Sequence, residues 1–233
     1  MKQDGRGHLH LLTQAERRAR AIFQQLGFAT VGGPEVETEY YNFDALNISA
    51  DHPARDLWDT FWLEPRSASR LLRTHTSPVQ IRYLENHPPP VRIIAPGRVF
   101  RYEATDATHN YQFHQLEGLV VDRQINLAQL KGVVEEFLRQ FFNLADLATR
   151  FRPSYFPFVE PGVEVDILWR DKFVEVMGAG LVHPTVLDGV GLDPEVWSGF
   201  AFGLGLDRLT MIRHGVDDVR YFYDGHIGFL QQF

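Results

Sequence analysis

The sequence contains no cysteine. Disulfide frameworks, thiolate zinc sites and cysteine nucleophiles are therefore excluded, and any metal ion must be held by oxygen or imidazole groups. The sequence also lacks an uninterrupted apolar run of about 18 residues, the length that a membrane-spanning helix needs. Charged residues interrupt the first 25 positions, which leaves no signal-peptide core there. We therefore expect a cytoplasmic protein.

Basic residues are too few for a chain that would bind nucleic acid through its own surface charge. The 233 residues include 23 Lys and Arg against 30 Asp and Glu, so the net charge is −7. A nucleic-acid substrate would need further contacts from elsewhere. With 44% hydrophobic residues and no internal repeat, we predict one globular domain over residues 12–233 after a flexible arm over residues 1–11.

Two helices are predicted from apolar residues at helical spacing and from their end signals. Thr13 and Glu16 have the spacing of a capping box at the start of the first helix, and Gly27 ends it. Asn126 and Gln129 have the same spacing at the start of the second. Both helices have one apolar stripe and are expected to pack on a core.

Strands dominate between and after these helices. Residues 91–103 and 113–122 predict two antiparallel strands joined by a long polar loop over 104–112. Similar patterns predict the remaining elements: strands at 28–31, 163–169, 173–177 and 199–204, and a helix at 206–214. Because strands follow one another with few crossover helices, we predict an α+β fold with an antiparallel sheet flanked by helices.

One face of the predicted hairpin is unusually polar. Since side chains alternate along a strand, this face would carry Arg101, Glu103, Phe113, Gln115 and Glu117. A solvent-exposed sheet face is one interpretation. The long loop, and the mixture of aromatic, guanidinium and carboxylate groups without lysine, favour the other interpretation, the floor of a ligand site.

A second polar segment runs from Arg73 to Gln80 and is dense in hydrogen-bond donors and acceptors. His75 is either a structural histidine or a group that orients a polar ligand together with Ser77 and Gln80. The segment has no metal-ligand spacing, and the sequence offers no base and carboxylate at a spacing that supports a hydrolytic triad.

A glycine-rich segment, residues 199–208, precedes the last predicted helix. It is no dinucleotide fingerprint, because Arg208 stands where the third glycine should be. Its glycines either permit tight strand packing or place Arg208 in the first turn of a helix. In that turn, the helix dipole and the guanidinium would both favour a phosphate.

An aromatic run bounded by prolines occupies residues 155–162. Such a run is either core or, through Phe156 and Phe158, a pair of rings that faces an aromatic ligand. Glu160 and Glu164 are either solvated carboxylates or oxygen ligands for Mg²⁺.

Taken in order, these segments resemble the motifs of the class II aminoacyl-tRNA synthetases, and among them the alpha subunits of the bacterial phenylalanine-specific enzymes. The resemblance spans nearly the whole chain. Residues 33–37 resemble class motif 1. Motif 2 is matched by Phe100-Arg101-Tyr102-Glu103 together with Phe113-His114-Gln115-Leu116-Glu117-Gly118. Motif 3 is matched by Gly203-Leu204-Gly205-Leu206-Asp207-Arg208. The phenylalanine-specific signatures are matched by residues 52–62, 73–78 and 155–161.

The resemblance implies a class II catalytic domain and a reaction in two steps. Phenylalanine and ATP would form phenylalanyl-adenylate, and the acyl group would then pass to the terminal adenosine of tRNA(Phe). Arg101 and Arg208 are implied as catalytic residues that bind the α- and γ-phosphates. Phe113 and Arg208 would sandwich the adenine, and Glu103 would accept from its amino group.

A phenylalanine pocket is implied as well. Its expected members are Trp62, His75, Ser77, Gln80, Gln115, Glu117, Phe156, Phe158 and Ala201. Gln115 and Glu117 would take the substrate ammonium. Phe156 and Phe158 would pack against the substrate ring, above the small Ala201. Glu160 is expected to help bind Mg²⁺ at the contact with a beta subunit.

The expected partners are a beta subunit in an α2β2 assembly, tRNA(Phe), ATP and L-phenylalanine, with no membrane. The sequence departs from the class at Asp207, where Glu is common, and we expect no amino-terminal tRNA-binding coiled coil, anticodon-binding domain or editing module. Two alternatives stay open: a paralogue that adenylates an amino acid without transfer to tRNA, and a non-catalytic amino-acid or nucleotide sensor. Arg101, Glu103 and Arg208 together disfavour the sensor.

Overall fold

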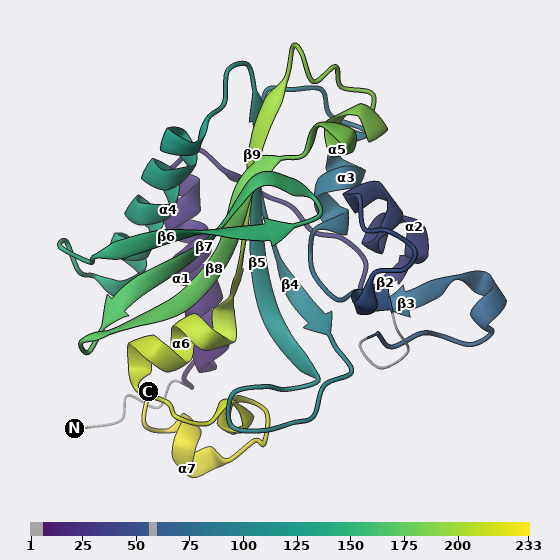
Figure 1. Cartoon of the computed structure of the whole chain (residues 1–233). Coiled ribbons are helices and arrows are strands. Elements are labelled where there is room, and N and C mark those ends of the chain that lie inside the picture. Colours follow the sequence, from purple (N-terminus) through teal and green to yellow (C-terminus); the bar gives the residue numbers. More distant parts are fainter. Residues whose placement is uncertain (1–6, 56–59) are drawn as a thin grey trace.

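A seven-stranded sheet forms the centre of the computed structural model, which describes residues 7–55 and 60–233 (Figure 1). The strand order is β1-β4-β5-β9-β8-β7-β6, and only the β1–β4 pair is parallel. Its strands are β1 (Ala29–Thr30), β4 (Val91–Phe100), β5 (Gln112–Asp122), β6 (Thr149–Phe156), β7 (Val159–Trp169), β8 (Lys172–Val182) and β9 (Ser198–Gly205). A small antiparallel pair consists of β2 (Val36–Thr38) and β3 (Arg70–Leu72). The predicted α+β fold with an antiparallel sheet is confirmed.

Helices cover the two faces of the sheet unequally (Figure 1). The α-helices are α1 (Leu11–Gln25), α2 (Glu39–Asn42), α3 (Pro78–Leu84), α4 (Leu127–Phe142), α5 (Pro184–Gly189), α6 (Leu206–His214) and α7 (Ile227–Leu230). Helices α1, α4 and α6 bury one face, to which Leu116 and Val120 contribute. Part of the other face packs on α3 and α5 through Leu119 and Val121. In the parts of the chain that are described, no helix has the length and apolar character to cross a membrane.

Helix α4 begins as the sequence predicts, whereas α1 does not. At α4, the Asn126 side chain accepts from the backbone of Gln129, and the Gln129 side chain accepts from that of Asn126. Helix α1 begins at Leu11 with His10 as its N-cap, so the capping box predicted at Thr13 is wrong. Burial of Leu11 against residues near the C-terminus stabilises this additional turn. The predicted arm therefore reaches into α1, and its residues 1–6 lie outside the described part.

The predicted hairpin is present, but its first strand is shorter than expected. Strand β4 ends at Phe100, which pairs with Gln112 of β5. Arg101 and Glu103 therefore lie in the connecting loop rather than on a shared strand face. The Arg101 amide still donates across the hairpin to the Tyr111 carbonyl, and the chain then turns where the Glu103 amide donates to the Arg101 carbonyl, each bond being 2.9 Å long.

Residues 155–162 comprise the end of β6, the turn at residues 157–158 and the start of β7. The aromatic run thus lies at the end of a hairpin whose first strand, β6, the sequence did not predict. Strand β7 begins at Val159, before the predicted start at Val163, and the Glu160–Pro161 peptide bond is cis. The predicted strands at 173–177 and 199–204 are confirmed as parts of β8 and β9, and the helix at 206–214 is confirmed as α6.

Candidate active site

Two glycines lie side by side on the sheet face that α3 and α5 cover only in part, next to Glu117. Glu117 on β5 is the cross-strand neighbour of Gly203 on β9, which in turn pairs with Gly178 on β8. A Cβ atom at Gly178 would lie 2.9 Å from the Phe156 ring. One at Gly203 would lie 3.2 Å from side-chain atoms of Gln115 and Glu117. The backbone therefore forms a floor between a carboxylate and an aromatic ring.

At one edge of this floor, Glu117 is buried and accepts two hydrogen bonds. The Ser77 hydroxyl donates to its Oε2 at 2.5 Å, and the Gln80 amide donates to the same atom at 2.9 Å. Burial raises the pKa of Glu117 to about 7, although both donors oppose the shift. The three polar residues that the sequence placed in one pocket are thus in direct contact. A carboxylate with this pKa is well suited to receive a cation.

Aromatic side chains gather at the other edge of the floor. The rings of Phe156 and Phe158 are stacked with centroids 6.1 Å apart, and both pack against the buried cluster that contains Ala201. Trp62 packs against the same cluster, and the Arg66 guanidinium lies 3.5 Å from the centre of its ring. The remainder of the predicted 52–62 signature lies partly outside the described residues.

His75 lies beside the polar edge with both ring nitrogens buried. Neither nitrogen has a hydrogen-bond partner of good geometry among the described residues. Burial, reinforced by the positive charge of Arg101, lowers the pKa of His75 to about 3, so the imidazole is neutral. A buried ring that lacks well-formed hydrogen bonds costs stability unless a ligand supplies them, which favours the orienting role over the purely structural one.

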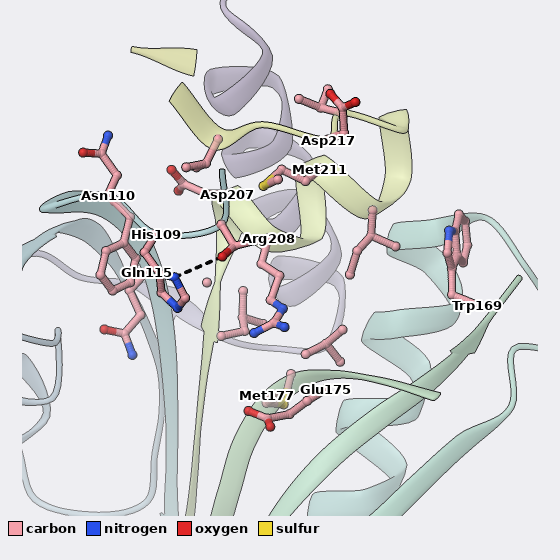
Figure 2. Close-up of a pocket in the computed structure, with 18 of the residues that line it drawn as sticks. His109, Asn110, Gln115, Trp169, Glu175, Met177, Asp207, Arg208, Met211 and Asp217 are labelled. Atoms are coloured by element: carbon pink, nitrogen blue, oxygen red, sulfur yellow. Dashed lines mark hydrogen bonds between the residues drawn. The ribbon is translucent and has the colours of Figure 1, made fainter. Parts of the chain in front are cut away.

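A cavity of about 650 Å³ adjoins the floor at the N-terminal end of α6. It brings together the four residues that the resemblance assigns to ATP, Arg101, Glu103, Phe113 and Arg208, and it also includes Gln115. Figure 2 shows the Arg208 side chain extending into this cavity, toward the strand that carries Glu175 and Met177. The size and the mixed polar lining suit a nucleotide.

Two arginines line the cavity, one in the loop after β4 and one in α6. Arg101 donates from Nε to the Thr74 carbonyl at 3.1 Å, and its guanidinium lies 5.1 Å from the centre of the Phe113 ring. Arg208 is exposed in the first turn of α6 and forms no hydrogen bond or ion pair within residues 7–55 and 60–233. The cavity thus has one anchored guanidinium, at Arg101, and one without a partner among the described residues, at Arg208.

The sequence did not single out His109 or Glu175, which also line the cavity. His109 is held in the 101–111 loop by Asp106, which accepts the backbone N–H groups of Thr108 and His109 at 2.6 and 2.8 Å. Glu175 is an exposed carboxylate on β8. A polar residue inside a predicted strand was the available signal for Glu175. Nothing in the loop composition distinguished His109.

Asp207 is buried, and both of its carboxylate oxygens accept hydrogen bonds from other residues. Its two oxygens accept from the backbone N–H of His114 at 2.7 Å and from the Tyr223 hydroxyl. Burial raises the pKa of this carboxyl, and the two donors oppose the shift. The Asp207 carboxylate therefore links α6 to β5, whereas Glu175 is exposed and lines the cavity.

No described residues form a cluster of three or more His, Cys, Asp or Glu side chains suited to a metal ion. Glu160 is 74% exposed and pairs with His183 at 3.2 Å, which is too few ligands for a site built by this chain alone. Mg²⁺ commonly keeps several waters and binds one or two carboxylates together with substrate phosphates. Glu175, beside the proposed phosphate-binding arginine, fits that arrangement.

Comparison with known proteins shows the family to which this chain belongs. Residues 1–233 match the family described as tRNA synthetases class II core domain (F). A phenylalanine–tRNA ligase alpha subunit of Prochlorococcus marinus (strain MIT 9313) is 56% identical over 227 residues, which are 97% of this chain and 66% of that protein. The corresponding subunit of Edwardsiella ictaluri (strain 93-146) is 55% identical over 97% of this chain and 68% of its own length. The chain thus spans about two thirds of the length of these relatives.

The fold is also similar to that of solved class II enzymes. A crystal structure of pyrrolysyl-tRNA synthetase from Desulfitobacterium hafniense has a TM-score of 0.70 at 21% identity, covering 92% of this chain and 73% of that one. At this identity the two chains share a fold.

Proposed function

We propose that this chain, which belongs to the class II tRNA synthetase core family (F), activates L-phenylalanine with ATP and transfers it to tRNA(Phe). The observation that carries the proposal is the buried Glu117, hydrogen-bonded to Ser77 and Gln80 at the edge of a glycine floor. It lies next to a cavity with two arginines. An amino acid and a nucleotide would meet there.

Phenylalanine would bind with its ammonium group on Glu117 and Gln115 and its ring against Phe156 and Phe158. Neutral His75 would hydrogen-bond the substrate from the polar edge. Gly178 and Gly203 leave room for the Phe156 ring and for the Gln115 and Glu117 side chains that would contact the substrate. Tyrosine would be used poorly, because its hydroxyl would be desolvated near Phe158 and Ala201 without a partner.

In the first step, a carboxylate oxygen of phenylalanine attacks the α-phosphorus of ATP. A new carboxyl–phosphorus bond forms, the bond to the bridging oxygen breaks, and pyrophosphate leaves with the electron pair. Arg101 would stabilise the charge that develops on the α-phosphate oxygens. Arg208 would hold the γ-phosphate, with Phe113 against the adenine and Glu103 at its amino group.

Class II enzymes use Mg²⁺ with ATP, and the ion neutralises phosphate charge when bound. Glu175 would hold it together with the triphosphate, in keeping with its exposed carboxylate on β8. Glu160 as a further Mg²⁺ ligand remains a prediction, and it would take further ligands from a partner, since His183 is its one ion-pair partner among residues 7–55 and 60–233.

The second step would move the acyl group to the 3′-terminal adenosine of tRNA(Phe), with this chain as the catalytic alpha subunit of an α2β2 enzyme in the cytoplasm. The names of the relatives support this assignment, because each is called an alpha subunit. The acidic composition supports it as well, since the chain offers little charge to hold tRNA alone. The missing contacts would come from the beta subunit or from other parts of the protein.

The test is amino-acid-dependent exchange of pyrophosphate into ATP, screened over all twenty amino acids. We expect exchange with phenylalanine, very little with tyrosine, and aminoacylation of tRNA(Phe) when a beta subunit is added. Exchange without aminoacylation under that condition would favour the adenylating paralogue. Absence of exchange with every amino acid would favour the sensor.

A further inference from the structure

The residues after α6 form an outer wall of the nucleotide cavity. Val216, Asp217 and Val219 line it on this side. The Val219 amide donates to the Ala107 carbonyl at 2.9 Å, so this segment is attached to the loop that carries His109. The C-terminal segment is therefore part of the architecture of the cavity.

Tyr223, farther along this segment, closes a hydrogen-bond network behind the cavity. Its hydroxyl donates to one oxygen of buried Asp207 and lies 3.1 Å from His114 Nδ1. The other Asp207 oxygen accepts the backbone N–H of His114. The rings of Tyr223 and His114 are parallel within 8°. Each of the three residues thus contacts the other two.

This network connects the two elements that face each other across the cavity. Asp207 is followed in α6 by Arg208, and His114 lies on β5 between Phe113 and Gln115. Arg208 and Phe113 both line the cavity, whereas Tyr223 does not. The separation of the arginine from the aromatic ring therefore depends on hydrogen bonds made by their immediate neighbours.

We propose that Tyr223 is a positioning residue of the nucleotide site, which acts through Asp207 to hold Arg208 opposite Phe113. Both Asp207 oxygens accept a hydrogen bond, and the tyrosine hydroxyl supplies one of the two donors. Removal of the hydroxyl leaves a buried oxygen unpaired, and the side chain can then rotate away from His114. The inference rests on the proposed function, because it assigns ATP to this cavity.

The test compares Tyr223→Phe with Tyr221→Phe in the full chain. Tyr221 is a matched control, since it lies in the same segment, is 42% exposed and stacks on Phe229 away from the cavity. Calorimetric titration with Mg-ATP gives the ATP dissociation constant, and pyrophosphate exchange gives KM for ATP and for phenylalanine separately. We expect Tyr223→Phe to raise both ATP constants about tenfold and to leave the phenylalanine KM unchanged.

A purely structural role would reduce the folded fraction and the thermal midpoint without moving the ATP constants. The positioning role is overturned if the ATP constants of Tyr223→Phe lie within about twofold of those of Tyr221→Phe. Should Tyr223→Phe fail to fold, Asp207→Asn takes its place, because the amide keeps the shape but has only one accepting oxygen, so one of the two hydrogen bonds is lost or reversed. We expect about threefold weaker ATP binding from that variant, and unchanged binding would overturn the proposal.

The two proposals fail separately. Tight ATP binding without phenylalanine-dependent exchange would count against the proposed function alone. If phenylalanine-dependent exchange is present but Tyr223→Phe and Tyr221→Phe have equal ATP constants, the result would count against the positioning role alone. A wild-type chain that binds no ATP would overturn both.

Discussion

Protonation of Glu117 should govern how phenylalanine is captured. Burial raises the pKa of this carboxyl to about 7, and only its ionised form can pair with the substrate ammonium. The pH dependence of kcat/KM reports on groups of the free enzyme. We therefore expect kcat/KM for phenylalanine to fall below pH 7, to about one tenth of its plateau at pH 6. The bound ammonium favours the ionised form, so kcat should change much less.

Pyrophosphate exchange at low phenylalanine and saturating ATP measures this profile. Glu117→Gln is the matched variant, since its amide oxygen can still accept from Ser77 and Gln80. Loss of the buried charge should lower kcat/KM by about 10²- to 10³-fold and remove the step near pH 7. A wild-type profile that is flat from about pH 6 to 8, or a variant that keeps the step, would refute the reasoning.

The raised pKa of Glu117 also makes the free energy of unfolding depend on pH. The pKa of this carboxyl is about 7 in the folded chain, against an ordinary value of 4.5 in the unfolded chain, so the folded state binds the proton more tightly. Stability is therefore lost as the pH rises through this interval, by about 3 kcal/mol in total. Glu117→Gln should raise the free energy of unfolding at about pH 8 and change it little at about pH 4. Denaturant titration at the two pH values measures the difference.

Three further substitutions test the site. Arg101→Ala should lower adenylate formation in single-turnover assays about 10²- to 10³-fold, because a charge-stabilising donor is lost, and a loss below about threefold would remove Arg101 from the mechanism. Ala201→Gly should admit para-substituted phenylalanines in the exchange assay by enlarging the pocket, and unchanged discrimination would place the limit elsewhere. Gly178→Ala should raise the phenylalanine KM, because its Cβ would lie 2.9 Å from the Phe156 ring, and should leave ATP affinity intact. If Gly178→Ala weakened the binding of phenylalanine and of ATP equally, misfolding would be the explanation instead.

Local patterns were sufficient for most of the sheet. The β4–β5 hairpin, β8, β9 and α4 all follow signals within a few residues, such as the reciprocal cap at Asn126. The start of α1 could not be found in this way, because Leu11 is stabilised by a cluster from the other end of the chain. Strand β6 was missed because Arg150 and Arg152 interrupt its apolar pattern. Both arginines contact buried Asp166 on β7, a partner that only the register shows.

The candidate site was predictable to the extent that its residues lie in recognisable motifs. Ser77, Gln80 and Glu117 lie in two of these motifs and meet in the structure. The extended face proposed for Arg101 and Glu103 was wrong in detail, because β4 ends at Phe100 and the Glu103 amide then bonds back to the Arg101 carbonyl. The Tyr223 contact was not predictable, since it joins residues 16 and 109 positions apart through side chains.

The glycine floor limits how the selectivity of the pocket can change. Gly178 and Gly203 have no side chain to trim, so substitutions there can only add atoms and make the space shallower. A wider choice of substrates must come from the walls, at Phe156, Phe158 or Ala201. Redesign toward bulkier amino acids therefore has few positions to work with, and each of them packs against the same hydrophobic cluster.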